Sequence, residues 1–103
     1  MAGRRHYAVH LLYAGEDVVC RQQVVATVEG RCVEHYPLTE ELPFTEWIGG
    51  VAVLSGWEEA DCLLPASFDD VVHWLLSKPG THVWHIEASD YAGGTVLRLK
   101  CLP

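Results

Sequence analysis

Residues 36–55 read "YPLTEELPFTEWIGGVAVLS" and set an acidic, proline-punctuated segment against a Gly-Gly pair and an apolar run. This stretch decides the fold, because it is either a loop that carries a site or a connection between two parts of a β-sheet. Pro37 helps to end an extended run, and residues 39–47 show no clear period and predict a loop. The Gly-Gly pair indicates a bulge or a close backbone approach within a strand at residues 48–55. The pattern favours a structural connection between two strands.

Three extended segments precede this connection, at residues 6–14, 18–29 and 31–38. Gly30 separates the last two where a tight turn needs a positive φ, so "VEGRCVEHYPL" predicts a hairpin. Alternation places two sets of side chains on shared faces: Tyr7, Val9, Leu11 and Tyr13 in the first strand, and Cys20, Gln22, Val24, Ala26 and Val28 in the second.

The chain predicts one helix, at about residues 67–77. Ser67 is suited to the N-cap, and Asp69 and Asp70 fall in the first turn, where the helix dipole favours negative charge. The apolar side chains follow helical spacing: Phe68, Val71, Val72, Leu75 and Leu76. Lys78-Pro79-Gly80 ends the helix.

Residues 81–88 and 95–102 predict two further strands, joined through "SDYAGG". The fold class is therefore α+β: a small β-dominated domain of about six strands, in the order β-β-β-β-α-β-β, with one amphipathic helix. At 103 residues, the chain is most simply one domain, residues 1–103.

Composition excludes several classes of protein. The net charge of −7, with only seven Lys and Arg, argues against a nucleic-acid partner, because phosphate backbones need clustered cations. No segment approaches the roughly 20 apolar residues that span a membrane. The apolar run after Arg4 and Arg5 meets Glu16 and Asp17 without a small-residue cleavage site, so it predicts the first strand rather than a signal peptide.

Four cysteines, with no CxxC spacing, predict neither a zinc site nor a redox motif: Cys20, Cys32, Cys62 and Cys101. Two disulfides remain possible from the even count. Without an export signal, four reduced and mostly buried thiols are favoured, which predicts a cytoplasmic location.

The histidines are the candidates for a metal site. His6 and His10 share a strand face but lie about 13 Å apart, too far to bind one zinc ion together directly. His82 and His85 are three positions apart, which places them on opposite faces of a strand. No metal and no cofactor is therefore predicted. The alternative is that histidines gather across different strands.

No catalytic residue is predicted. The acidic pairs are typical of a solvated surface, and Asp69-Asp70 is explained by the helix start. Cys62 lies among acids that disfavour a thiolate, and Cys32 and His35 face opposite ways on a strand. No phosphate-loop or nucleophile-elbow motif is present.

The tryptophans suggest an interaction surface. Trp47, Trp57 and Trp84 are expected to fill or border the core, whereas Trp74 lies off the apolar stripe of the helix. An exposed Trp74 would suit an interface, and packing on a neighbouring loop is the alternative. The strand at residues 95–102 is readily placed at a sheet edge, where a second copy can pair. The interface candidates are Trp74, Leu99 and Leu102.

"VVATVEGRCVEHYPL" and "WIGGVAVLS" resemble the accessory β domain that flanks the barrel of amidohydrolase-type metal-dependent hydrolases. The residues that resemble its hairpin and its exit strand are Val25, Val28, Gly30, Arg31, Val33 and Gly50 with residues 51–54. The resemblance covers the first half of the chain. That family follows its exit strand with a metal-binding His-x-His, whereas this chain continues "SGWEE". The resemblance implies a free-standing relative of the accessory domain, without the hydrolase and its metal ligands.

Two functional hypotheses follow. The leading one is a cytoplasmic, non-enzymatic β-rich domain that acts through self-association or a protein partner. The second is a small-ligand or metal-binding module, or a minor hydrolase, that uses His6, His10, His82 or His85 gathered across strands. The convergence of at least three of these side chains would favour the second.

Overall fold

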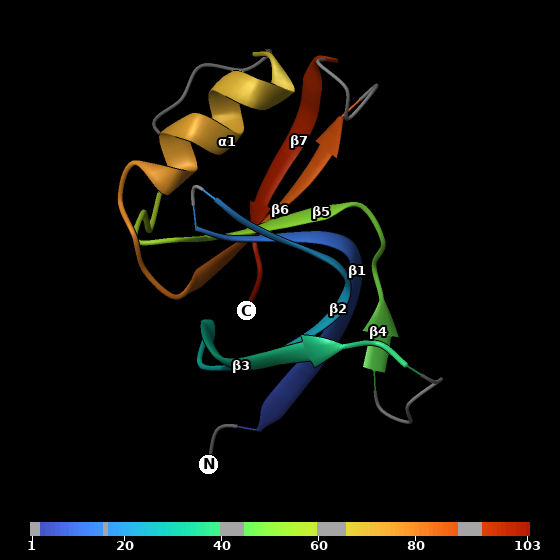
Figure 1. Ribbon diagram of the computed structural model, residues 1–103. Helices are drawn as coiled ribbons and strands as arrows, with labels where there is room; N and C mark the ends of the chain where they lie inside the picture. Colours follow the sequence, from blue (N-terminus) through green and yellow to red (C-terminus); the bar gives the residue numbers. More distant parts are fainter. Residues whose placement is uncertain (1–2, 16, 40–44, 60–65, 89–93) are drawn as a thin grey trace.

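The structure of the protein is a computed structural model, which describes residues 3–15, 17–39, 45–59, 66–88 and 94–103 (Figure 1). Seven strands and one helix form a small β-dominated domain within these residues. Their order along the chain is β1 (Arg4–Gly15), β2 (Val18–Val28), β3 (Arg31–Pro37), β4 (Thr45–Trp47), β5 (Val51–Ser55), α1 (Phe68–Leu76), β6 (His82–Ala88) and β7 (Val96–Cys101). No helix in the described part of the chain is long and apolar enough to cross a membrane.

The sheet closes on itself to form a small barrel. β1 pairs with β2, β2 with β3, β3 with β6, β6 with β5, and β5 with β1. The β1–β5 pairing is parallel, and the other four are antiparallel. β4 runs parallel to the first half of β1, and β7 lies antiparallel along the outer side of β6. Figure 1 shows the strong curvature of β1 and β2 that allows this closure.

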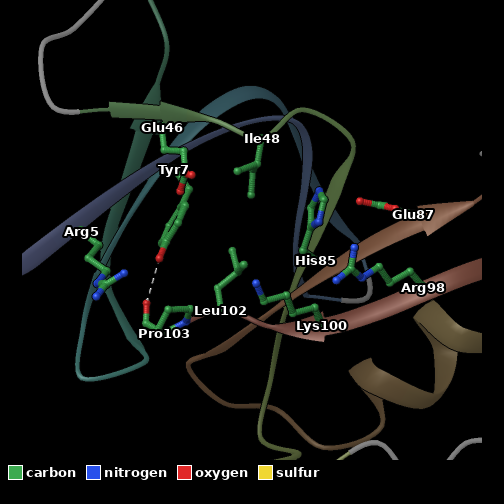
Figure 2. Close-up of a pocket in the computed structure, with 10 residues that line it drawn as sticks. All are labelled: Arg5, Tyr7, Glu46, Ile48, His85, Glu87, Arg98, Lys100, Leu102 and Pro103. Atoms are coloured by element: carbon green, nitrogen blue, oxygen red, sulfur yellow. Dashed lines mark hydrogen bonds between the residues drawn. The ribbon is translucent and has the colours of Figure 1, made fainter.

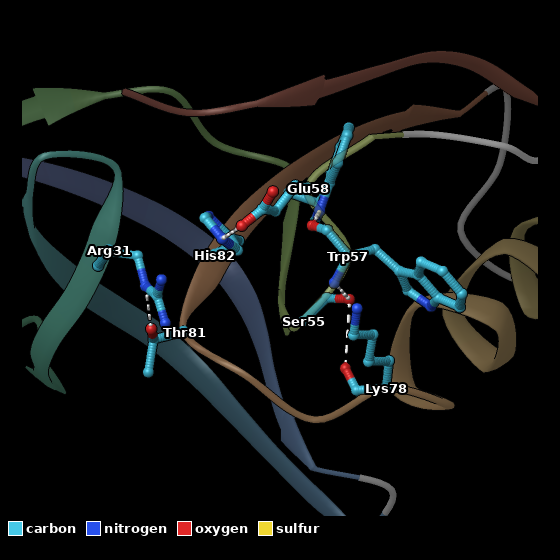
Figure 3. A network of polar contacts seen from close by, with 8 residues as sticks. Arg31, Ser55, Trp57, Glu58, Lys78, Thr81 and His82 are labelled. Carbon is cyan, nitrogen blue, oxygen red and sulfur yellow. Dashed lines mark hydrogen bonds and ion pairs between the residues drawn. The ribbon is translucent and has the colours of Figure 1, made fainter.

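β3 and β6 meet at one paired position, where Arg31 lies opposite His82. Beside it, the Cys32 amide donates to the Thr81 carbonyl at 2.7 Å, and Arg31 Nε donates to Thr81 Oγ1 at 2.7 Å (Figure 3). The barrel is therefore joined at one end of this seam.

Two hydrophobic clusters lie on opposite faces of β5 and β6. The barrel interior contains Tyr7, Val9, Leu12, Val25, Ala52, Val83 and Leu102. The outer cluster packs beneath the helix and contains Val51, Val53, Phe68, Val71, Val72, Leu75, Trp84, Ile86 and Val96. Alternation along β5 and β6 supplies both clusters, because successive side chains of a strand point to opposite faces.

The helix forms where the local signals predict it. Ser67 is the N-cap, and its hydroxyl accepts from the Asp70 amide at 3.2 Å. Phe68, Val71, Val72 and Leu75 are buried against β5, β6 and β7, and Leu76 is partly buried. Figure 1 shows α1 lying over one side of the sheet, beside β7.

The predicted loop at residues 39–47 and strand at residues 48–55 need correction. Thr45–Trp47 forms β4, which raises the number of strands from the six predicted to seven, and β5 begins only at Val51. Residues 40–44 lie outside the described part. Between the two strands, Gly49 and Gly50 have φ angles of 64° and 61°, which interrupt the extended backbone. β4 and β5 thus pair with β1 as two short parallel strands.

The predicted faces of the first two strands are also wrong. Tyr7 and Val9 enter the barrel, but Leu11 and Tyr13 pack against the outer cluster, so β1 changes faces near His10. In β2, Gln22 has a φ of 47° and breaks the alternation there. Residues 23–27 are then buried on both faces of the strand.

Candidate functional site

A cavity of about 410 Å³ opens at one end of the barrel, between β4 on one side and β6 and β7 on the other (Figure 2). β4 and β6 are not hydrogen-bonded to each other. Its lining comes from β1, β4, β6, β7, the segment after β7, and Ile48 between β4 and β5. We call this cavity the barrel mouth. Clefts at the mouths of β-barrels are common places for ligands.

The floor of the barrel mouth is apolar. Tyr7 is 4% exposed and Leu102 is 5% exposed, and both belong to the interior cluster, with Ile48 packed against it. The Tyr7 hydroxyl donates to the carbonyl oxygen of Pro103 at 3.2 Å, and Thr27 Oγ1 donates to the same oxygen at 3.0 Å. Two hydroxyl groups thus fix the chain after β7 across the floor.

The β6–β7 register places four polar side chains on the mouth side of the sheet. His85 lies opposite Lys100, and Glu87 lies opposite Arg98. Their neighbours in each strand, including Ile86 and Leu99, face the outer cluster, except Leu97, which is exposed. Alternation therefore separates a polar face from an apolar one on the same two strands.

The basic side chains of this acidic chain concentrate at the barrel mouth. Arg5, Arg98 and Lys100 line it, and they are three of the seven basic residues in a chain of net charge −7. Glu46 and Glu87 are the acids of the lining. The charged side chains of the lining, three positive and two negative, sum to a formal charge of +1.

These three cations have no side-chain hydrogen bond or ion pair with any residue that the structure describes. Three of the four basic side chains elsewhere do have partners. Arg4 pairs with Glu34 at 2.7 Å, Arg31 donates to Thr81, and the Lys78 amine lies 5.0 Å from the centre of the Trp57 ring. The donors at the barrel mouth remain open to an added acceptor.

His85 is held at the wall of the barrel mouth by the backbone. Its Nε2 lies 3.2 Å from the carbonyl oxygen of Gly49. A carbonyl accepts only, so Nε2 carries the proton of this hydrogen bond. Nδ1 is then the ring nitrogen left for another contact.

The four candidate histidines occupy different surroundings. His10 is exposed and makes an edge-on contact with Trp47 at 4.9 Å, and His6 is partly buried on β1. His82 Nε2 lies 3.6 Å from Glu58 (Figure 3). Within the described residues, no three His, Cys, Asp or Glu side chains form a group suited to a metal ion. These histidines are thus not brought together as metal ligands.

The three interface candidates are each at least partly buried. Trp74 is stacked on Trp57 with ring centres 4.9 Å apart and an interplanar angle of 10°. Leu99 packs against the outer cluster, and Leu102 is buried in the barrel. The large apolar side chains that are exposed are others: Val18, Val19, Val33, Trp47 and Leu97. Trp47, expected to fill or border the core, is thus 53% exposed.

Cys20, Cys32 and Cys101 are free and partly buried, and Cys62 lies outside the described residues. Burial raises the pKa of the Cys32 thiol, and the nearby Glu34 carboxylate adds to this, against an opposing backbone hydrogen bond at Glu34. Burial also raises the pKa of the Cys101 thiol. A raised pKa keeps a thiol protonated and makes it a poor nucleophile.

Comparison with known proteins gives no relative. No protein-family model, curated protein or solved structure matches the chain. The resemblance to an amidohydrolase accessory domain stays a prediction.

Sequence reasoning missed Arg5, Arg98 and Lys100 as a group. Part of the signal was present, because Arg98 and Lys100 alternate in the last strand and so share a face. Their meeting with Arg5, more than ninety positions away in the chain, depends on β1 and β7 reaching the same end of the barrel.

Proposed function

We propose that this α+β domain is a non-enzymatic binding module whose barrel mouth takes an anionic group of its ligand. The observation that carries the proposal is the gathering of Arg5, Arg98 and Lys100, without partners among the described residues, around one cavity. Guanidinium and ammonium groups recognise carboxylate and phosphate oxygens through charge-assisted hydrogen bonds.

The ligand is proposed to carry an apolar body as well as an anionic group. Ile48 is partly buried and offers apolar surface beneath the charged rim, whereas Tyr7 and Leu102 are almost fully buried. A ligand that covers Ile48 removes apolar area from water, which favours binding by about 25 cal/mol per Å². The acids Glu46 and Glu87 on the rim disfavour a compact, highly charged anion, because it would face their repulsion.

This proposal develops both hypotheses drawn from the sequence. From the leading hypothesis it keeps the binding of a partner as the activity. From the second hypothesis it takes a ligand pocket, but no metal ion. Free thiols at Cys20, Cys32 and Cys101 support a reducing, cytoplasmic setting as part of the proposal. Self-association remains a second candidate, because β7 pairs only with β6 among the described strands.

Charge reversal tests the role of the barrel mouth. Titrations of the isotope-labelled protein with benzoate, hexanoate and phenyl phosphate are followed by the amide shifts of β6 and β7. Arg98→Glu should weaken binding at least about tenfold, since it replaces an attractive charge contact by a repulsive one. The matched control is Arg21→Glu, which makes the same charge change at an exposed side chain away from the barrel mouth.

Equal weakening by both variants would mean that only the net charge matters. Shifts confined to residues away from β1, β6 and β7 would overturn the barrel mouth as the site.

A further inference from the structure

The outer edge of β7 lies directly beside the barrel mouth. β7 is hydrogen-bonded to β6 on one side, and the described residues place no strand along its other side over residues 97–101. Nearer its start, the edge is covered, because Ser67 bridges to Thr95 and the Val96 amide donates to the Ala66 carbonyl at 2.7 Å. The free edge therefore begins after Val96.

The hydrogen-bond register identifies which backbone groups point outward. The Leu102 amide donates to the Val83 carbonyl at 2.8 Å, which makes Val83–Leu102 a hydrogen-bonded pair of the antiparallel ladder. Such pairs alternate with non-hydrogen-bonded ones, so Lys100 and Arg98 direct their backbone groups to β6. The N–H and C=O groups of Leu99 and Cys101 then face away from β6, on the free edge.

We propose that the barrel mouth and this edge together bind an acidic peptide in extended conformation, which adds to β7 as a further strand. This inference rests on the proposed function, because the carboxylates of the peptide are the anionic groups that Arg98 and Lys100 meet. Strand addition of this kind takes its affinity from main-chain hydrogen bonds and its specificity from alternate side chains.

Geometry sets the sequence pattern of the peptide. A residue opposite Leu99 forms the hydrogen-bonded pair, while residues opposite Arg98 and Lys100 form non-hydrogen-bonded pairs, whose side chains lie closer together. Acidic residues at positions i and i+2 of the peptide therefore face both cations. The side chain at position i+1 lies on the opposite face of the sheet, the same face as the Leu99 side chain, where an apolar residue is favoured.

Charge complementarity selects this occupant over a second copy of the chain. If two β7 strands pair antiparallel about Leu99, Arg98 of one copy lies opposite Lys100 of the other. Like charges directly opposite each other destabilise a strand pair.

The test uses a capped Glu-Val-Glu-Val-Glu peptide and two N-methylated forms, measured by isothermal titration calorimetry with the full chain. Methylation of the valine nitrogens removes the donors that face Leu99 and Cys101, whereas methylation of the central glutamate nitrogen alters a donor that faces away. The valine form should bind at least about fivefold more weakly, because it loses two backbone hydrogen bonds. The glutamate form should bind within about threefold of the parent peptide.

Each other outcome has a definite meaning. If both methylated peptides bind as well as the parent peptide, strand addition is overturned. If Arg98→Glu still weakens the binding of these peptides, the anion site stands. If no peptide binds but small carboxylates do, the peptide inference fails alone. If neither class binds, the proposed function fails with it. A dimer that sedimentation detects and that Arg98→Glu alters, while no peptide binds, would assign the edge to a second copy.

Discussion

At the scale of single residues, Ser55 shows how one buried hydroxyl group joins three parts of the structure. It is 0% exposed at the end of β5, and its Oγ donates to the Leu75 carbonyl at 2.7 Å. The same oxygen accepts from the Trp57 amide at 3.1 Å (Figure 3). The helix, the end of β5 and the chain that follows it are thus fixed to one atom.

Ser55→Ala should destabilise the fold, because it leaves a buried carbonyl and a main-chain amide without this partner. We expect a loss of about 1–3 kcal/mol in the free energy of unfolding, measured by urea denaturation. Thr39→Ala is the control, since Thr39 is exposed and its change is expected to stay within about 0.5 kcal/mol. Equal midpoints for the two variants would contradict the role of Ser55.

The Cys32 and Cys101 thiols carry a prediction about pH. Burial raises the pKa of both in the folded chain, so folding favours the protonated thiol. The stability that this contributes is complete below the ordinary thiol pKa and is lost as pH rises through the raised values. Iodoacetamide should therefore alkylate both cysteines more slowly at pH 8 than it alkylates an unstructured cysteine peptide, as mass spectrometry would show. Rates equal to those of the peptide would contradict the shift.

At the scale of elements, local signals predict the helix and long-range ones decide the strands. Ser67, the apolar spacing and the helix stop all lie within one short segment, so α1 follows from the sequence. β4 does not, because Thr45–Trp47 is a strand only through its parallel pairing with β1. The face change in β1 and the barrel mouth likewise depend on closure of the barrel, for which no local pattern exists.

Packing between the end of β5 and the end of the helix requires two glycines. A Cβ atom at Gly80 would lie 2.4 Å from the Gly56 Cα, and one at Gly56 would lie 2.6 Å from the Pro79 carbonyl oxygen. Both contacts are with backbone, which cannot turn aside as a flexible side chain does.

Gly80→Ala should therefore lower the free energy of unfolding by about 1–3 kcal/mol, as overpacking does in a close-packed interior. Gly15→Ala is the matched control, because its Cβ would meet only Val18 at 3.7 Å, an ordinary contact. Thermal or urea unfolding of the two variants checks this. If Gly80→Ala were as stable as Gly15→Ala, the close approach of the two backbone segments would be refuted.

At the scale of the whole molecule, the barrel is joined unevenly. β1 and β2 pair along nearly their full lengths, from Arg4–Val28 to Gly15–Val18. β3 and β6 pair only where Arg31 meets His82. Local opening takes the route that breaks the fewest buried contacts, and in this fold that route is the β3–β6 seam.

Hydrogen exchange of the intact chain tests this seam. Amides of β3 should exchange through openings of lower free energy than the amides of β1 and β5, whose side chains form the core. Thr81→Ala removes the hydroxyl that accepts from Arg31 Nε, so it should speed exchange in β3 and leave β5 unchanged. Arg21→Ala is the control, because Arg21 is exposed and lies away from the seam. Two results together would show that the barrel opens as one cooperative unit. One is equal protection of the amides of β1, β3 and β5, and the other is a Thr81→Ala variant that changes their exchange rates equally.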